Sequence, residues 1–295
     1  MKSFSFDWKL IALIFLVLVF FALNSILTRM AIATQNIDAF SFTFLRIFAA
    51  MIMLLAIYFY KNRSLKISLK TNYLSGLMFF LYAIFFTYSY LNMAAGIGTL
   101  ILFAVVQLTM IFFALFLNEK LTLNKILGIA IAFFGLFYLL YPKDDFTISY
   151  FHTFLMILSG VAWAIFSILG KKSKNVLLNS TDSFFKAFII TFICAIFYII
   201  FFPNSVKLDL YTSILALFSG AITTAFGASL WYFIMSKIEL ITASIVQLLV
   251  PVIAIFISVL FLDEALTFEL VISTIIILFG IFIALYKKGF NGYLT

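Results

Sequence analysis

Long apolar runs limit how this chain can fold more than any other feature of its sequence. The run from Leu10 to Leu23 is apolar on every side, so neither a helix nor a strand built from it has a face for water. Of the 295 residues, 66% are hydrophobic and 10% are charged, whereas an average soluble domain is about 45–50% apolar and about 25% charged. A soluble fold of this size could not bury that much apolar surface. The sequence therefore predicts an all-α membrane protein.

The same runs indicate how often the chain crosses the bilayer. One crossing takes about 20 helical residues, and windows of about 19 residues place ten spans with short loops. This pattern excludes a soluble enzyme on an anchor, and the single cysteine, Cys194, excludes a disulfide scaffold. The predicted spans are 10–30, 40–60, 73–92, 98–117, 125–141, 151–170, 184–202, 210–236, 242–261 and 268–286.

Lysine and arginine are distributed unevenly between the loops. With the N-terminus in the cytoplasm, fourteen of them fall in inside segments, and only Lys143 and Lys207 fall outside. Cytoplasmic loops are enriched in these residues. The count predicts that both termini are cytoplasmic and that the protein is a multi-pass protein of the inner membrane.

The sequence also repeats itself. Shifting it by 145 residues aligns 115–141 with 260–286, with 12 of 27 positions identical. A Glu, a Thr, a Gly and a Tyr match in register, which apolar composition alone does not explain. We infer two homologous halves, 1–144 and 145–295, of five spans each. Because five is odd, the second half enters the membrane with opposite polarity, so the repeats are predicted to be inverted.

Inverted repeats are common in secondary transporters, whose substrate site lies near the midplane where the repeats meet. Rocking of one bundle against the other then exposes the site to each side in turn. The sequence therefore predicts an alternating-access transporter, while the duplication could also belong to a membrane protein that transports nothing.

The doubled signatures Leu-Asn-Glu-Lys-Leu-Thr (117–122) and Leu-Asp-Glu-Ala-Leu-Thr (262–267), each followed by a Gly-bearing apolar helix, resemble the EamA-type branch of the drug/metabolite transporter superfamily. Asn24 to Arg29, Arg46, Trp163 and Pro251 add to the resemblance. The resemblance implies a central cavity formed mainly by spans 1, 3, 4, 6, 8 and 9, with spans 5 and 10 peripheral. It also implies small metabolites, amino acids or drugs as substrates, often moved outward.

Uncharged polar and aromatic residues follow stripes on several predicted spans, since residues three, four or seven apart share one side of a helix. Such stripes can line a cavity, although small polar residues also serve helix packing. A buried indole or amide needs a hydrogen-bond partner, so the tryptophans and glutamines are stronger candidates for cavity lining. The predicted substrate-binding residues are Asn24, Tyr82, Tyr88, Gln107, Trp163, Thr224, Trp231 and Gln247.

Three further residues are predicted to act in gating or as a hinge. Arg29 and Arg46 fall in the outer third of their spans, where they could hold gate contacts or attract anionic groups. The alternative is that their long side chains reach back to the headgroups. Pro251 removes one backbone hydrogen bond from its span, which makes a hinge or a static kink.

Acidic residues are absent from the centres of the predicted spans, and Asp182 falls in an inside loop. Intramembrane hydrolysis needs converging Asp, Glu, His or Cys, so we expect no catalytic residue, metal or cofactor, and no enzyme. Without carboxylates there, uncoupled transport fits at least as well as proton antiport. The expected partners are a small-molecule substrate and the lipid bilayer, with no nucleic acid, in a monomer or homodimer.

The sequence thus favours a transporter, with export of amino acids or related amphipathic compounds as the leading function. A nucleotide-sugar or phosphate-ester carrier is the alternative, and it needs Arg29, Arg46 or Lys186 to point into the cavity. A non-transporting scaffold protein is a third possibility, and a bundle without a cavity would favour it.

Overall fold

The computed structural model describes residues 8–64, 73–93, 95–140, 149–171, 173, 175–261 and 268–285, and within them the regular elements are helices. The first half holds α1 (Trp8–Ala33), α2 (Ala39–Asn62), α3 (Tyr73–Ser89), α4 (Ala95–Phe116) and α5 (Leu123–Leu140). The second half holds α6 (Tyr150–Lys171), α7 (Val176–Phe201), the short η1 (Pro203–Ser205), α8 (Leu210–Phe218), η2 (Ser219–Thr224), α9 (Ala225–Met235), α10 (Leu240–Val246), α11 (Leu249–Phe261) and α12 (Phe268–Leu285).

Seven helical segments in the described residues are long and apolar enough to cross a membrane, and 73–89, 123–135 and 271–285 are shorter apolar helices. Large apolar side chains such as Phe134 and Ile199 are exposed on the outside of the bundle, where lipid tails would cover them. The predicted all-α, multi-pass membrane protein is confirmed at this level. The predicted boundary at 144 and 145 lies outside the described residues.

Side-chain caps mark where several helices begin. Asp38 accepts a hydrogen bond from the Ser41 backbone N–H at 2.9 Å and so caps α2. Asn175 caps α7 in the same way through the Leu178 N–H at 3.1 Å. The α7 helix therefore starts eight residues before the predicted span at 184, because its polar first turns lowered the hydropathy there.

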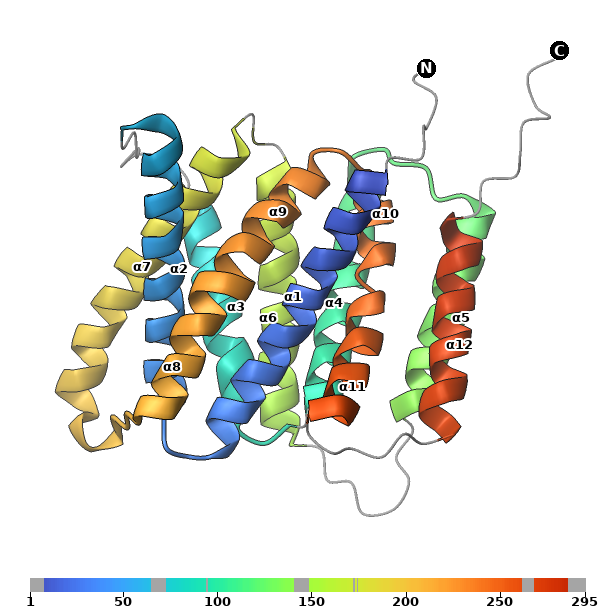
Figure 1. Ribbon diagram of the computed structural model, residues 1–295. Coiled ribbons are helices and arrows are strands. Elements are labelled where there is room, and N and C mark those ends of the chain that lie inside the picture. The colour runs from blue at the N-terminus through green and yellow to red at the C-terminus, as the bar shows by residue number, and fades with distance from the viewer. Residues whose placement is uncertain are drawn as a thin grey trace, which may run out of the picture.

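The two halves run in opposite directions through the bundle. Arg29, near the end of α1, bonds to the Tyr90 carbonyl just after α3, and Asn92 in the same connection lies 3.3 Å from His152 at the start of α6. The end of α1 and the start of α6 therefore share one end of the bundle, as Figure 1 shows. This arrangement agrees with the predicted inversion of the repeats.

Helices α5 and α12 form a pair at one side of the bundle, away from α7 (Figure 1). Glycines allow their backbones to touch: a Cβ on Gly128 would lie 2.4 Å from the Gly280 carbonyl oxygen, and one on Gly280 would lie 2.6 Å from the Ala132 nitrogen. Close approach through small residues is a usual way for helices to associate in lipid. The peripheral position expected for spans 5 and 10 is confirmed.

Two predicted spans are not regular α-helices. Span 8 consists of α8, the π-helical η2 and α9, and span 9 is divided between α10 and α11 at Gln247 and Leu248. Pro251 has no N–H for the Gln247 carbonyl, and the Val250 N–H donates to that carbonyl instead at 3.0 Å. The break therefore lies four residues before the proline, inside the bundle.

Candidate substrate site

A small cavity lies where the two halves meet. Its volume is about 10 Å³, which is room for a single water molecule, and all the side chains that line it are buried. They come from α1, α2 and α3 in the first half and from α6, η2 and α9 in the second. The lining residues are Phe21, Asn24, Arg46, Phe79, Tyr82, Trp163, Thr223, Thr224 and Ala228.

This lining differs in two places from the one that the family resemblance implied. Helix α2 contributes Arg46, although span 2 was not expected at the cavity, and neither α4 nor the broken span 9 lines it. Helix α2 enters the lining because it packs directly against η2, where a Cβ on Gly220 would lie 2.1 Å from the Arg46 carbonyl oxygen.

Arg46 is the only charged residue among the lining side chains, and it is 0% exposed. Its Nε donates to Thr224 Oγ1 at 3.1 Å, and its Nη2 donates to the Tyr82 hydroxyl at 3.3 Å. The guanidinium carbon lies 5.4 Å from the Tyr82 ring centroid and 5.3 Å from that of Phe86, which gives cation–π attraction. Nη1 has no hydrogen-bond partner among the described residues.

The alternative that Arg46 reaches back to the headgroups is therefore wrong. The side chain points into the bundle. There it contacts two aromatic rings of its own half and a hydroxyl of the opposite half.

Asn24 and Tyr82 connect the two halves beside Arg46. Asn24 Nδ2 donates to the Tyr82 hydroxyl at 3.1 Å, and Asn24 Oδ1 accepts from the Ser219 hydroxyl at 2.8 Å. Ser219 opens the π-helical segment η2, and Thr224 closes it. Two hydroxyls of η2 are thus bonded to first-half polar side chains at the cavity, which regular stripe counting did not predict for Ser219.

Gly220 explains how η2 comes so close to α2. A Cβ at this position would lie 2.1 Å from the Arg46 carbonyl oxygen and 2.9 Å from Ala49 Cβ. Only glycine allows the two backbones to approach this closely, and the approach sets the distance from Arg46 to Thr224.

Trp163 forms the wall of the cavity from α6. Its indole Nε1 donates to Gln247 Oε1 at 3.2 Å, so the amide at the break between α10 and α11 holds the ring. Trp163 packs edge-on against Phe21, with centroids 5.1 Å apart, and lies 4.7 Å from the Tyr82 ring. The predicted residues Asn24, Tyr82, Trp163 and Thr224 are thus brought together, and Gln247 supports them.

Four other predicted residues lie away from the cavity lining. The Trp231 indole donates to Ser167 at 3.0 Å. Gln107 is buried, and neither atom of its amide has a partner among the described residues. Tyr88 packs beside a separate apolar cluster formed by α1, α2 and α8, and Arg29 donates to the Tyr90 carbonyl at 2.7 Å. Their predicted roles in binding and gating stay predictions, as does that of Pro251.

The placement of Asp182 in a loop is wrong. Asp182 is 2% exposed within α7 and forms an ion pair with Lys186 one turn further on, which is 0% exposed. The hydropathy window began after Asp182 and so separated the pair. The spacing of four residues between an acid and a base was the signal that could have revealed it.

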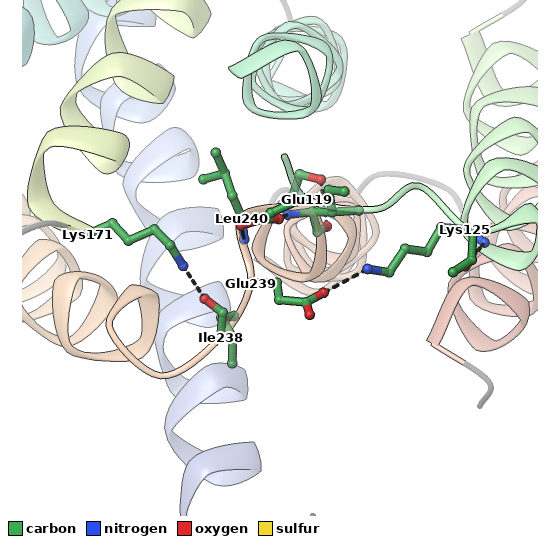
Figure 2. A network of polar contacts seen from close by, with 9 residues as sticks. Glu119, Lys125, Lys171, Ile238, Glu239 and Leu240 are labelled. Carbon is green, nitrogen blue, oxygen red and sulfur yellow. Dashed lines mark hydrogen bonds and ion pairs between the residues drawn. The ribbon is translucent and has the colours of Figure 1, made fainter. Parts of the chain in front are cut away.

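A polar network joins the halves at the end of the bundle where α1 begins (Figure 2). Glu119, after α4, accepts hydrogen bonds from the backbone N–H groups of Leu240 and Ile241 at 2.9 and 3.0 Å. Lys125 pairs with Glu239 at 2.8 Å. Within the second half, Lys171 donates to the carbonyls of Met235, the last residue of α9, and of Ile238 in the connection to α10. Most of these bonds hold the start of α10 against the first half.

Polar contacts also join the halves at the opposite end. Asp38, which caps α2, accepts from the Tyr198 hydroxyl at 3.1 Å and from the Lys207 backbone N–H at 2.9 Å. The cavity therefore lies between two ends that are both held by contacts between the halves.

Comparison with known proteins gives the family. The pattern of the EamA-like transporter family matches the chain twice, at residues 8–141 and 151–286. The chain belongs to the EamA-like transporter family. The two matches cover the two halves that the internal repeat indicated, and they indicate a transporter rather than an enzyme.

Full-length relatives agree with this assignment. An uncharacterized protein of Pseudomonas aeruginosa is 33% identical over 282 residues, 96% of each chain. The uncharacterized transporter YoaV of Bacillus subtilis is 23% identical over 86% of this chain and 89% of its own length. A probable amino-acid metabolite efflux pump of Escherichia coli is 25% identical over 78% of this chain and 81% of its own.

A solved crystal structure shares the fold. It superposes with a TM-score of 0.76 at 15% sequence identity, over 94% of this chain and 97% of the other. At that identity the likeness concerns the fold alone.

Proposed function

We propose that this EamA-family protein is an alternating-access transporter of small organic metabolites in the inner membrane, and that it works as an exporter. The observation that carries the proposal is the small cavity between the two repeats, which polar and aromatic side chains line together. Arg46, Asn24 and Tyr82 enter it from one half, and Trp163 and Thr224 enter it from the other. Secondary transporters place their sites at such an interface.

The proposed topology has ten spans with both termini in the cytoplasm. The seven long helical segments and the three shorter apolar helices support the number. The excess of lysine and arginine in the inside segments supports the orientation. In this orientation the network around Glu119 closes the cytoplasmic end, and the contacts of Asp38 close the outer end.

The proposed transport cycle opens these ends in turn. A cavity of about 10 Å³ cannot hold an organic solute, so loading requires the halves to move apart at one end. The bonds at each end connect α-helical units across the repeat interface, and breaking one set while keeping the other would expose the cavity to one side.

Amino acids and related amphipathic compounds are the leading substrate class. The aromatic walls and the hydroxyl, amide and guanidinium groups suit a solute with an apolar body and a carboxylate. The name of the Escherichia coli relative, a probable amino-acid metabolite efflux pump, supports the same class. A phosphate-ester carrier is the second candidate, because it requires a cation in the cavity and Arg46 is one.

A flux panel in proteoliposomes tests the proposal. Amino acids, nucleosides and phosphorylated sugars are offered to wild-type protein, to Asn24→Ala and Trp163→Ala, and to Phe134→Ala as a lipid-facing control that is 61% exposed. We expect saturable flux of at least one class, reduced about tenfold or more in the two cavity variants and unchanged in the control. Wild-type flux equal to that of protein-free liposomes for all classes would overturn the proposed function.

A further inference from the structure

Arg46 places a positive charge in the cavity without an acidic partner. The guanidinium is completely buried, and no carboxylate is among the residues that line the cavity. An ionised group away from water is unfavourable unless it is paired, and arginine stays protonated in proteins. Nη1, which bonds to nothing in the described residues, is a charged donor available to a ligand.

The neighbouring hydroxyls also offer donors. The Tyr82 hydroxyl oxygen already accepts from Asn24 and Arg46, and Thr224 Oγ1 accepts from Arg46. Each of these hydroxyls keeps one proton to donate. Asn24 Oδ1, the amide acceptor, already accepts one hydrogen bond from Ser219. A ligand group that only accepts hydrogen bonds, as an ionised carboxylate does, matches this set.

The charge count discriminates between ligand classes. Among the described residues, the other fully buried cation is Lys186, and it is paired with Asp182. That carboxylate therefore balances Lys186 and not Arg46. A zwitterionic amino acid would leave the loaded cavity with one positive charge, and a dianionic phosphate would leave it with one negative charge. A monoanion makes the loaded cavity neutral, which is the least costly state inside a membrane.

The remaining walls define the rest of the ligand. Phe21, Phe79 and Trp163 line the cavity with aromatic surface, and the rings of Phe21 and Trp163 meet edge to face at 5.1 Å. Such surfaces can bury the apolar or aromatic part of a ligand. They provide no anionic partner for a ligand's ammonium group.

We propose that the preferred substrate is a monoanion with a carboxylate on Arg46 and an apolar body between the aromatic rings, and that it crosses the membrane as a charged species. This inference rests on the proposed transport through the cavity. An anion moves toward the positive side of a membrane, so an inside-negative potential drives its export. About 60 mV corresponds to about tenfold accumulation of a monoanion.

The test compares solutes that share one aromatic body. The probes are N-acetylphenylalanine (monoanion), phenylalanine (zwitterion), phenylalaninamide (cation) and phenyl phosphate (phosphate ester). Binding is measured as the rise in melting temperature of detergent-solubilised wild-type protein. Flux is measured in proteoliposomes clamped at zero and at about 60 mV with potassium and valinomycin, against protein-free liposomes as the leak control.

We expect N-acetylphenylalanine to stabilise the protein and to accumulate about tenfold on the positive side under the clamp. Phenylalanine should bind at least tenfold more weakly, with flux that does not respond to the potential, and phenylalaninamide should not bind. Stronger binding of phenyl phosphate than of N-acetylphenylalanine would assign the site to phosphate esters and overturn the monocarboxylate assignment.

Variants test whether Arg46 is the residue that binds the monoanion. Arg46→Gln should bind N-acetylphenylalanine at least tenfold more weakly, and Arg46→Lys should restore part of the binding because it keeps the charge without the planar fork. Lys61→Gln removes an exposed charge from the same helix and is the matched control. The wild-type panel decides the question even if an Arg46 variant does not fold.

The outcomes separate this inference from the proposed function. Voltage-independent flux of phenylalanine that exceeds flux of N-acetylphenylalanine would leave a transporter standing and overturn the monoanion. Binding of N-acetylphenylalanine without flux of any probe would support the site and contradict transport. Equal binding of all four probes would overturn the proposed role of Arg46.

Discussion

Two fully buried cations in this bundle are held in opposite ways. Lys186 in α7 has Asp182 one turn away on the same helix, so its charge is balanced by the sequence around it. Arg46 in α2 has a hydroxyl from each of two other helices and two aromatic rings, and one of its nitrogens lacks a partner among the described residues. The first arrangement stabilises the fold, whereas the second leaves a charge that a ligand can satisfy.

The largest expected effect is on stability, and it contrasts the two cations directly. Lys186→Met leaves the Asp182 carboxylate buried without its counter-charge, and breaking a buried pair costs about 3–5 kcal/mol. Arg46→Met loses two hydrogen bonds but also removes the cost of burying a charge without an acidic partner, so we expect the free energy of unfolding to change by only about 1 kcal/mol. Thermal melts in detergent measure both.

A double variant controls this experiment. Asp182→Asn with Lys186→Met removes both charges and should recover most of the stability lost in the single variant. Equal losses for Lys186→Met and Arg46→Met would contradict the distinction between a structural and a ligand-binding cation.

The next effect concerns the approach of η2 to Arg46. Gly220→Ala places a Cβ 2.1 Å from the Arg46 carbonyl oxygen, and overpacking of this kind costs about 1–3 kcal/mol. The helices must separate, which lengthens the bond from Arg46 to Thr224, so we expect weaker binding of anionic probes as well. Gly227→Ala in the same span is the control, since its Cβ would meet its nearest atoms at 3.5 Å. Similar losses in both variants would show that the close approach is unimportant.

A smaller effect is expected at the end of the bundle drawn in Figure 2. Glu119→Gln replaces the carboxylate that caps α10 through two backbone N–H groups, and losing a cap costs about 1 kcal/mol. Lys125→Gln breaks only the ion pair to Glu239, whose side chain is 63% exposed, and surface pairs contribute about 0–1 kcal/mol. Melting of the two variants side by side checks the order, and a larger loss for Lys125→Gln would contradict it.

The last predicted change, similar in size, is at the cavity wall. Trp163→Phe keeps an aromatic ring and removes the indole N–H that Gln247 accepts, a hydrogen bond that contributes about 0.5–1.5 kcal/mol. Trp8→Phe, at a position 72% exposed, is the control. We expect a lower melting temperature and altered probe flux for Trp163→Phe only. Unchanged flux would remove Trp163 from the proposed binding surface.

Much of the site could be predicted from single positions. Asn24, Tyr82, Trp163 and Thr224 are polar or amphipathic residues on otherwise apolar spans, and the structure brings them to one cavity. Gln107 and Trp231 are also polar or amphipathic residues on apolar spans, but they lie away from the cavity. A helix inside the bundle packs against several neighbours, and a polar stripe does not indicate which neighbour it faces. Ser219 could not be singled out, since the π-helical turn of η2 changes the face that it presents.

The sequence by itself determined the membrane environment, the repeat and the membership in the EamA-like transporter family, because apolar run length and an internal match of Glu, Thr, Gly and Tyr are properties of the chain alone. Tertiary structure decided whether the side chains of Arg46 and Lys186 point into the bundle or toward its ends. A long side chain near a helix end can reach outward or inward, and the choice depends on groups supplied by other helices. For Arg46 those groups are Tyr82, Thr224 and the space that Gly220 leaves free.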